Sequence, residues 1–359
     1  MGTQFAIEVR NLCKSYDKLL AVDHIDFQVP EGEIFGFLGP NGAGKTTTIK
    51  MLISLLAPDE GQALVCGYDV ERQPYEAKRQ FGVVPEEANV YTELSPWDNL
   101  MFTAQIYRVP VNERKRRIEA LLERFGLQGK RSDKVFTLSK GMRQRLSLAM
   151  ALIHEPKVLF LDEPILGLDV QSALMIKDHI RQLNAQGTTI FLTTHQIDMA
   201  DDICQRVAII DNGQIAAIES PENLKAAIEG RRTVEVVVTN GGTNKQYASL
   251  AKLPGVTQAI RQGEKIRLYT GDPPTVLTGV MAFAHQENLP VMAINTNGPS
   301  LEEVFMVVTG KGMGAARRKH PGAECKGCPV KEVCDSEKEE TDNKPKKHHS
   351  RFLKGSCDH

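Results

Sequence analysis

Residues 39–46 carry the residue types that bind phosphate groups, in the pattern G-x-x-x-x-G-K-[ST]. An apolar run, 34–38, precedes them, and a run with helical periodicity, 47–56, follows. Glycines let backbone amides turn toward phosphate oxygens, and the N-terminus of the following helix adds its positive dipole. Lys45 would reach the outer phosphates, and the Thr46 hydroxyl would bind Mg²⁺. This context favours a nucleotide-phosphate site over a chance glycine-rich turn. The residues expected to contact the nucleotide in this loop are Gly39, Pro40, Asn41, Gly42, Ala43, Gly44, Lys45, Thr46 and Thr47.

Two adjacent carboxylates end a second apolar run. Residues 158–161 are Val-Leu-Phe-Leu, and Asp162 and Glu163 follow them. Because successive side chains of a strand point to opposite sides, the two carboxylates suit different tasks. Asp162 would hold the shell of a Mg²⁺ ion, and Glu163 would orient or deprotonate an attacking water. A strand that ends in two acids is usually just a solvated strand end. The presence of the phosphate loop in the same chain is what favours a catalytic role for these two acids.

A third pattern opens a helical run shortly before the two carboxylates. Residues 138–145 read Leu-Ser-Lys-Gly-Met-Arg-Gln-Arg. Here the sequence resembles the ATP-binding cassette (ABC) family, whose signature is an L-S-x-G-x-x-Q-R element before an Asp-Glu strand. The resemblance covers roughly residues 5–228. Ser139 alone would be an ordinary helix N-cap, and the two interpretations are compatible because a capped helix N-terminus also attracts anions.

The resemblance implies roles that isolated residues would not reveal. Tyr16 lies where the family places an aromatic ring on adenine, Asp169 falls on the family's dimer-contact loop, and His195 matches a catalytic histidine that touches the γ-phosphate. A lone tyrosine or histidine would more often be structural. In this family the signature of one subunit meets the ATP bound to the other. The signature residues expected to act in trans are Ser139, Lys140, Gly141 and Met142.

Departures from the common family pattern are informative. The usual Gln before the helical insertion is Glu86 here, which keeps an oxygen for Mg²⁺ but loses an amide donor and adds a charge. Together with Thr46 and Asp162, Glu86 is therefore expected to hold Mg²⁺. The signature has Lys140 and Met142 in place of a common Gly and Gln. Similar variants, and the segment Pro-Ser-Leu-Glu-Glu-Val-Phe at 299–305, are typical of ATPase subunits of ABC-2 type export systems.

Alternating segments of two kinds position these motifs. Short apolar β-branched runs and longer helical stretches fill residues 5–228, which indicates an α/β layered domain. With the resemblance, the predicted fold is a P-loop NTPase domain of ABC type at residues 1–230, with a helical insertion at about 87–150 where the strand signal vanishes. The pattern restarts after this domain and predicts a small α/β accessory domain at 231–309.

Residues 310–359 hold almost no large apolar side chains, so they cannot bury enough surface to offset the entropy of ordering. We predict a disordered tail unless a metal orders it. Cys325 and Cys328 have the spacing of metal ligands, and Cys334 and Cys357 would complete a site for Zn²⁺ or an iron-sulfur cluster. Cys334 and Cys357 do not form a second C-x-x-C that would match the first pair. An equal alternative to a metal site is therefore a flexible tail whose cysteines are reduced thiols.

The composition of the 359-residue chain excludes several classes of protein. With 44 basic and 45 acidic residues the formal net charge is −1, so no cationic excess draws the chain onto nucleic acid. No run reaches the roughly 18 apolar residues of a membrane span, and the start lacks the pattern of a signal peptide. Seven cysteines, an odd number, do not indicate a secreted disulfide framework. A cytoplasmic protein is expected.

Together, the motifs and the resemblance imply the ATP-binding and ATP-hydrolysing subunit of an ABC-2 type exporter. It would use ATP and Mg²⁺, form a homodimer that sandwiches ATP, and sit on the inner face of the cell membrane against a separately encoded multi-span permease. Two alternatives stay open: a soluble, non-transport ABC ATPase of DNA repair or translation, and an ATPase with a metal-sensing tail. The single copy of each motif and the short spacing from Gly39 to Leu138 count against the first.

Overall fold

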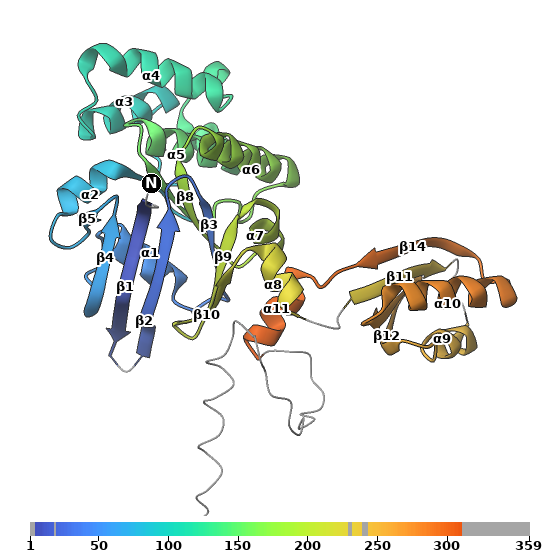
Figure 1. Ribbon diagram of the computed structural model, residues 1–359. Helices are drawn as coiled ribbons and strands as arrows, with labels where there is room; N and C mark the ends of the chain where they lie inside the picture. The colour runs from blue at the N-terminus through green and yellow to red at the C-terminus, as the bar shows by residue number, and fades with distance from the viewer. Residues whose placement is uncertain (1–3, 18, 229–231, 239–242, 311–359) are drawn as a thin grey trace, which may run out of the picture. The chain divides into compact units, whose positions relative to one another are not determined.

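The structure is a computed structural model that describes residues 4–17, 19–228, 232–238 and 243–310. The first domain is built around a central six-stranded sheet ordered β10-β9-β3-β8-β7-β6 (Figure 1). The strands from β9 to β6 run parallel, and β10 pairs antiparallel with β9. The strands of this sheet are β3 (Ile34–Leu38), β6 (Phe81–Val84), β7 (Val158–Asp162), β8 (Thr189–Thr194), β9 (Arg206–Asp211) and β10 (Gln214–Glu219).

Every residue of β3, β7 and β8 is buried. Parallel strands with both faces covered read as continuous apolar runs, which is why the runs at 34–38 and 158–161 were recognisable in the sequence. The register pairs Leu38 with Thr194 and Asp162 with Thr193. The carboxyl ends of the three strands therefore meet at one edge of the sheet, the edge at which ligands bind in open α/β sheets.

A four-stranded antiparallel sheet, ordered β2-β1-β4-β5, packs against the central sheet through aromatic side chains. Phe27 of β2 stacks on Phe35 of β3 with ring centroids 5.7 Å apart, and on Phe191 of β8 at 5.9 Å. These rings belong to one buried apolar core. The elements of this part are β1 (Phe5–Tyr16), β2 (Leu19–Pro30), α1 (Lys45–Leu52), β4 (Glu60–Val65), β5 (Tyr68–Asp69) and α2 (Pro74–Gln80).

Between β6 and β7 the chain forms helices and 3₁₀ turns only, where the sequence predicted a helical insertion. Ser95 caps the first helix by accepting a hydrogen bond from the Asp98 amide, and Pro96 follows it at the first helical position. α3 packs against α4 and α5. The remaining helices of the first domain are α3 (Pro96–Ile106), α4 (Val111–Arg124), the turns Gln128–Lys130 and Val135–Thr137, α5 (Lys140–Leu152), α6 (Val170–Ala185), α7 (Ile197–Ile203) and α8 (Pro221–Ala227).

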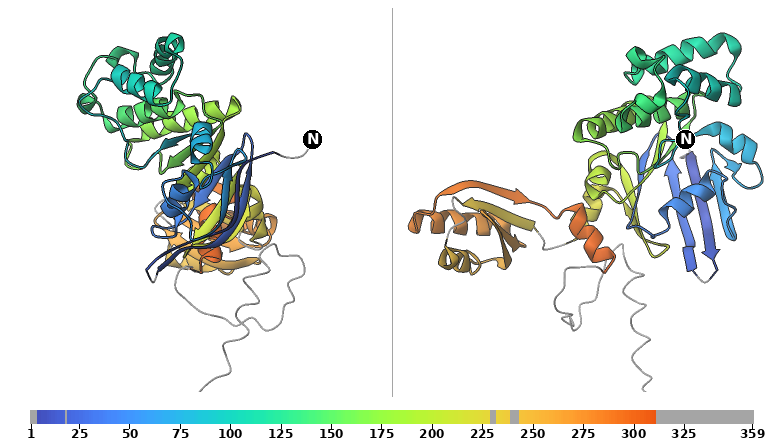
Figure 2. Two further views of the ribbon diagram at one scale, coloured as in Figure 1. Left: turned by 90° about the vertical axis from the view of Figure 1, so that its left-hand side faces the viewer. Right: turned by 180° about the vertical axis from the view of Figure 1, so that it is seen from behind.

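A third sheet, ordered β12-β13-β11-β14 and antiparallel throughout, has an apolar core of its own. Alternate residues of β11 and β13 pack against α9 and α10, so both helices cover one face of this sheet (Figures 1 and 2). Its element order is the βαββαβ pattern of ferredoxin-like folds. The elements are β11 (Arg232–Val238), α9 (Asn244–Leu250), β12 (Val256–Gln262), β13 (Lys265–Thr270), α10 (Pro273–Gln286) and β14 (Val291–Asn297).

Helix α11 (Leu301–Val308) follows β14 and packs against α7 and α8 of the first domain. Leu301 and Val304, three residues apart on one face, are buried in the same apolar core as Met199 of α7. A capping box between Ser300 and Glu303 sets the start of the helix. The sequence assigned this segment to the accessory unit, but its apolar face is buried against the first domain.

Helices long and apolar enough to span a membrane are absent from the part of the chain that the structure describes. The tail cysteines for which the sequence suggested a metal site, Cys325, Cys328, Cys334 and Cys357, lie outside the described residues.

Candidate functional site

The phosphate loop lies between the end of β3 at Leu38 and the start of α1 at Lys45. Gly44, at the N-cap of α1, has φ of 107°, and a Cβ atom there would lie 2.4 Å from the Ala21 carbonyl oxygen. Only glycine fits a position that is both left-handed and in contact with a neighbouring backbone. The backbone amides in the first turn of α1 have no partner within the helix, and such amides can face an anion.

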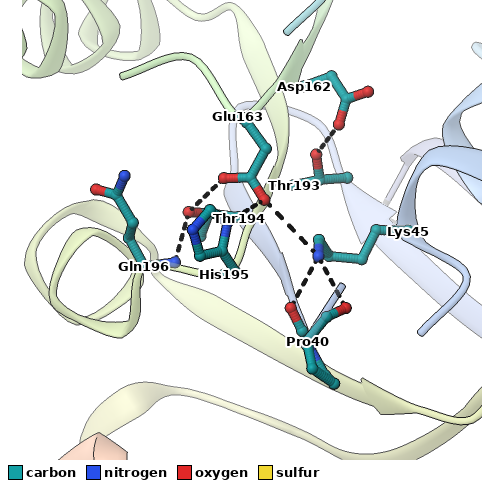
Figure 3. A network of polar contacts seen from close by, with 9 residues as sticks. Pro40, Lys45, Asp162, Glu163, Thr193, Thr194, His195 and Gln196 are labelled. Atoms are coloured by element: carbon teal, nitrogen blue, oxygen red, sulfur yellow. Dashed lines mark hydrogen bonds and ion pairs between the residues drawn. The ribbon is translucent and has the colours of Figure 1, made fainter. Parts of the chain in front are cut away.

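Lys45 is folded back onto this loop. Its Nζ atom donates hydrogen bonds to the carbonyl oxygens of Gly39 at 2.8 Å and Pro40 at 3.1 Å, and lies 3.7 Å from Glu163 Oε1 (Figure 3). Burial lowers the pKa of Lys45, while the carboxylates of Glu163, Asp162 and Glu86 oppose that shift. The Lys45 amine therefore lies among three carboxylates, at the point where phosphate oxygens are expected.

The two carboxylates at the end of β7 are both buried, and each has its own partners. Thr193 Oγ1 donates a hydrogen bond to Asp162 Oδ1, and Thr194 Oγ1 donates one to Glu163 Oε2 at 3.2 Å. His195 Nδ1 lies 2.8 Å from Glu163 Oε1 (Figure 3). Glu163 has φ of 48°, so the chain turns sharply at this residue. The structure therefore brings Lys45, Glu163 and His195 together from three separate elements.

A cleft of about 440 Å³ opens beside these groups. Tyr16 lines it with 45% of its surface exposed. Apolar Leu19, Ala21 and Leu166 also line the cleft, and no chemical pattern in the sequence marked them. The other lining residues are Asn41, Gly42, Gly44, Lys45, Thr46, Thr47, Glu86, Glu163 and His195, all of them predicted site residues. Of the residues predicted to contact ATP or Mg²⁺ within one subunit, Gly39, Pro40, Ala43 and Asp162 do not line it.

The signature residues lie elsewhere and do not line this cleft. Ser139 caps α5 by accepting a hydrogen bond from the Met142 amide at 3.2 Å, and Lys140 Nζ donates to the Leu166 carbonyl at 2.8 Å. Gly141 is tightly packed, because a Cβ atom there would lie 2.4 Å from Ser172 Oγ. Ser172 in turn donates to Asp169, the N-cap of α6, and these hydrogen bonds lower the pKa of the Asp169 carboxyl. The signature and the Asp169 loop thus form one connected unit.

The oxygen donors fit a magnesium ion that shares its shell with phosphate. Thr46 and Glu86 line the cleft, and Asp162 precedes the cleft residue Glu163. Among the described residues no three His, Cys, Asp or Glu side chains gather as a self-sufficient metal site. Mg²⁺ is usually held by one or two carboxylates together with substrate phosphates and water. For Zn²⁺ or an iron-sulfur cluster the described part of the chain offers no site.

The fold and the cleft define a P-loop nucleotide-binding domain. Residues 22–166 match the family model described as ABC transporter. The chain is 34% identical over 310 residues to the linearmycin resistance ATP-binding protein LnrL of Bacillus subtilis (85% of this chain, 98% of that protein). It is 35% identical over 311 residues to the Nod factor export ATP-binding protein I of Rhizobium sp. strain N33 (87% and 99%).

Solved structures of ATP-binding cassettes also resemble this chain. The structure of an ATP-binding subunit of an ABC transporter aligns with a TM-score of 0.57 at 32% identity, over 62% of this chain and 92% of that chain. A dimeric, post-hydrolysis ATP-binding cassette with ADP and Pi aligns with a TM-score of 0.55 at 25% identity, over 60% and 98%. The chain belongs to the ATP-binding subunits of ABC transporters and is an ATPase of that family. The predicted fold class and family are confirmed.

Proposed function

We propose that this chain powers an ABC-2 type exporter as a homodimer that encloses ATP and works on the cytoplasmic face of a membrane with a separately encoded permease. The observation that carries this proposal is the division of the site. Lys45, Glu163 and His195 line one cleft, whereas the signature and Asp169 lie outside it. A second copy would bring its signature to the nucleotide in this cleft, so the nucleotide becomes part of the interface.

Within the cleft each residue has a distinct task. Glu163 accepts a proton from the attacking water or orients that water, and His195 holds the Glu163 carboxylate and contacts the γ-phosphate. Lys45 turns from the loop carbonyls to the outer phosphates, and Tyr16 stacks on the adenine. Mg²⁺, held by Thr46, Asp162 and Glu86, would neutralise phosphate charge.

Export is supported by the relatives and by the end of the chain. Relatives that match over most of their length are named for Nod factor export or for resistance to linearmycin and daunorubicin. The segment 299–305, which resembles ABC-2 ATPases, forms the start of α11 and packs on the first domain. We infer that the cargo of the exporter is a drug, ion, lipid or polysaccharide.

The test uses Glu163→Gln, which keeps the size of the side chain and removes its basicity. Because a positioned proton acceptor typically contributes ~10² to 10⁴ in rate, this variant should bind ATP but lose most of its turnover. With ATP and Mg²⁺ it should elute as a dimer in size-exclusion chromatography. Lys45→Ala should lose nucleotide affinity and remain a monomer.

The matched control is Glu155→Gln, at an ion pair with Arg117 outside the cleft. It should hydrolyse ATP like the unmodified chain. Hydrolysis by Glu163→Gln at the rate of Glu155→Gln would remove Glu163 from its role. The export step is tested by copurification: a multi-span membrane protein should accompany the tagged chain from detergent-solubilised membranes, and its absence from a strain carrying both genes would contradict the assignment.

A further inference from the structure

Two threonines at the end of β8 stand out because each binds a different carboxylate. Thr193 and Thr194 are completely buried, which is unusual for hydroxyl groups without a task. Thr193 donates to Asp162, and Thr194 donates to Glu163 (Figure 3). Two adjacent hydroxyl groups at the end of β8 thus each donate a hydrogen bond to one of the two adjacent acids at the end of β7.

The backbone creates this one-to-one match. β7 and β8 run parallel with Asp162 opposite Thr193, and the Glu163 amide donates to the Thr193 carbonyl at 3.1 Å. The register therefore extends one residue past β7. Because Glu163 takes a left-handed conformation there, its side chain turns toward Thr194 while that of Asp162 stays beside Thr193.

The proton of the Thr194 hydroxyl has a defined direction. The Gln196 amide donates to Thr194 Oγ1 at 3.0 Å, which occupies the oxygen as an acceptor. The hydroxyl then donates its single proton to Glu163 Oε2 at 3.2 Å. Since His195 and Lys45 both approach Oε1, the two carboxylate oxygens are held from different sides. Thr194 sets the rotation of this carboxylate.

We propose that Thr194 and Thr193 are positioning residues with separate tasks: Thr194 orients Glu163 for the attacking water, and Thr193 orients Asp162 for the Mg²⁺ that accompanies ATP. This inference rests on the roles assigned to the two acids under the proposed function. It implies that replacing the Thr194 hydroxyl by a methyl group impairs turnover. The same replacement at Thr193 impairs metal-dependent nucleotide binding.

Threonine-to-valine variants separate the two tasks, since valine keeps the shape and the β-branching that suits a strand. Thr194→Val should lower kcat about 10- to 100-fold, the effect of losing a hydrogen bond to a charged group, with ATP affinity unchanged. Thr193→Val should raise the Mg²⁺ concentration needed for tight ATP binding about tenfold. The serine variants at both positions should restore most of each property.

Thr189→Val is the matched control. Thr189 is also buried in β8, and its hydroxyl accepts a hydrogen bond from the Gly32 amide at 2.8 Å, far along the strand from the two acids. This variant should lose stability with unchanged kcat and Mg²⁺ dependence. Its behaviour measures the general cost of removing a bound hydroxyl from this strand.

The measurements on the full chain are steady-state kcat and KM, binding of a fluorescent ATP analogue across a Mg²⁺ series, and Mn²⁺ binding by electron paramagnetic resonance. Distinct profiles for Thr194→Val and Thr193→Val, each rescued by serine, support the inference. Identical profiles, or profiles like that of Thr189→Val, overturn it. Hydrolysis by Glu163→Gln at the normal rate would instead contradict the proposed function. An inactive Glu163→Gln beside a fully active Thr194→Val overturns this inference alone.

Discussion

Gly39 occupies a position where a methyl group has no room, so Gly39→Ala tests the packing of the phosphate loop. A Cβ atom there would lie 2.4 Å from the Ile210 carbonyl oxygen, 2.8 Å from Ile210 Cγ2 and 3.2 Å from Ala43 Cβ. The closest obstacle is the backbone of β9, which cannot rotate away as a flexible side chain would. The loop must therefore move away from β9, and the Gly39 carbonyl that binds Lys45 moves with it.

The size of the effect follows from these contacts. Overpacking a well-filled site typically costs ~1 to 3 kcal/mol, and a clash with backbone places this variant at ~2 to 3 kcal/mol. In a domain of this size each kcal/mol lowers Tm by ~2 to 4 °C, so the first domain should melt ~4 to 12 °C lower. Displacement of the loop should also weaken ATP binding about tenfold, which corresponds to ~1.4 kcal/mol.

Two other glycines separate the clash from general effects of alanine. At Gly129, which has an ordinary φ, an added methyl group would meet no atom within 4 Å, so Gly129→Ala should leave Tm and ATP affinity unchanged. Gly32 is equally open but has φ of +77°, so Gly32→Ala should cost only ~1 to 2 kcal/mol of backbone strain and leave ATP affinity intact. Differential scanning fluorimetry and a nucleotide-binding titration measure both properties. If Gly39→Ala matched Gly129→Ala in both, the reasoning from close contact would be refuted.

Three further predictions concern other parts of the chain. Glu86→Gln should remain active, because the amide keeps an oxygen for Mg²⁺; loss of hydrolysis with intact ATP binding would show that the charge of Glu86 is required. Burial lowers the pKa of His154 to about 4, so the folded state keeps this imidazole neutral while the unfolded chain titrates near 6.5. Stability should therefore fall as pH decreases from 7 to 5, by ~1 to 2 kcal/mol, and His154→Gln should flatten that slope in denaturant titrations; an unchanged slope would contradict the assignment. Removal of residues 311–359 should leave basal ATP hydrolysis intact, because every nucleotide motif precedes residue 200; a large loss in a phosphate-release assay would disprove this.

The sequence by itself determined the class of chemistry. The loop at 39–46 and the acids Asp162 and Glu163 are contiguous motifs flanked by apolar runs, so their chemistry could be recognised before any contact was known. The apolar runs could be recognised because parallel strands buried on both faces are continuously apolar. The resemblance to the ABC family then predicted Tyr16, Glu86 and His195, and the structure places all three in the cleft.

Only the tertiary structure decided which groups meet. The contact between Thr194 and Glu163 depends on the register of two strands and on the left-handed turn at Glu163, neither of which leaves a mark in the sequence. Leu19 and Leu166 line the cleft as ordinary apolar residues, without a chemical signature of their own. The burial of Leu301 and Val304 in the core of the first domain was likewise decided by the tertiary structure, because apolar periodicity reports burial and does not identify the partner.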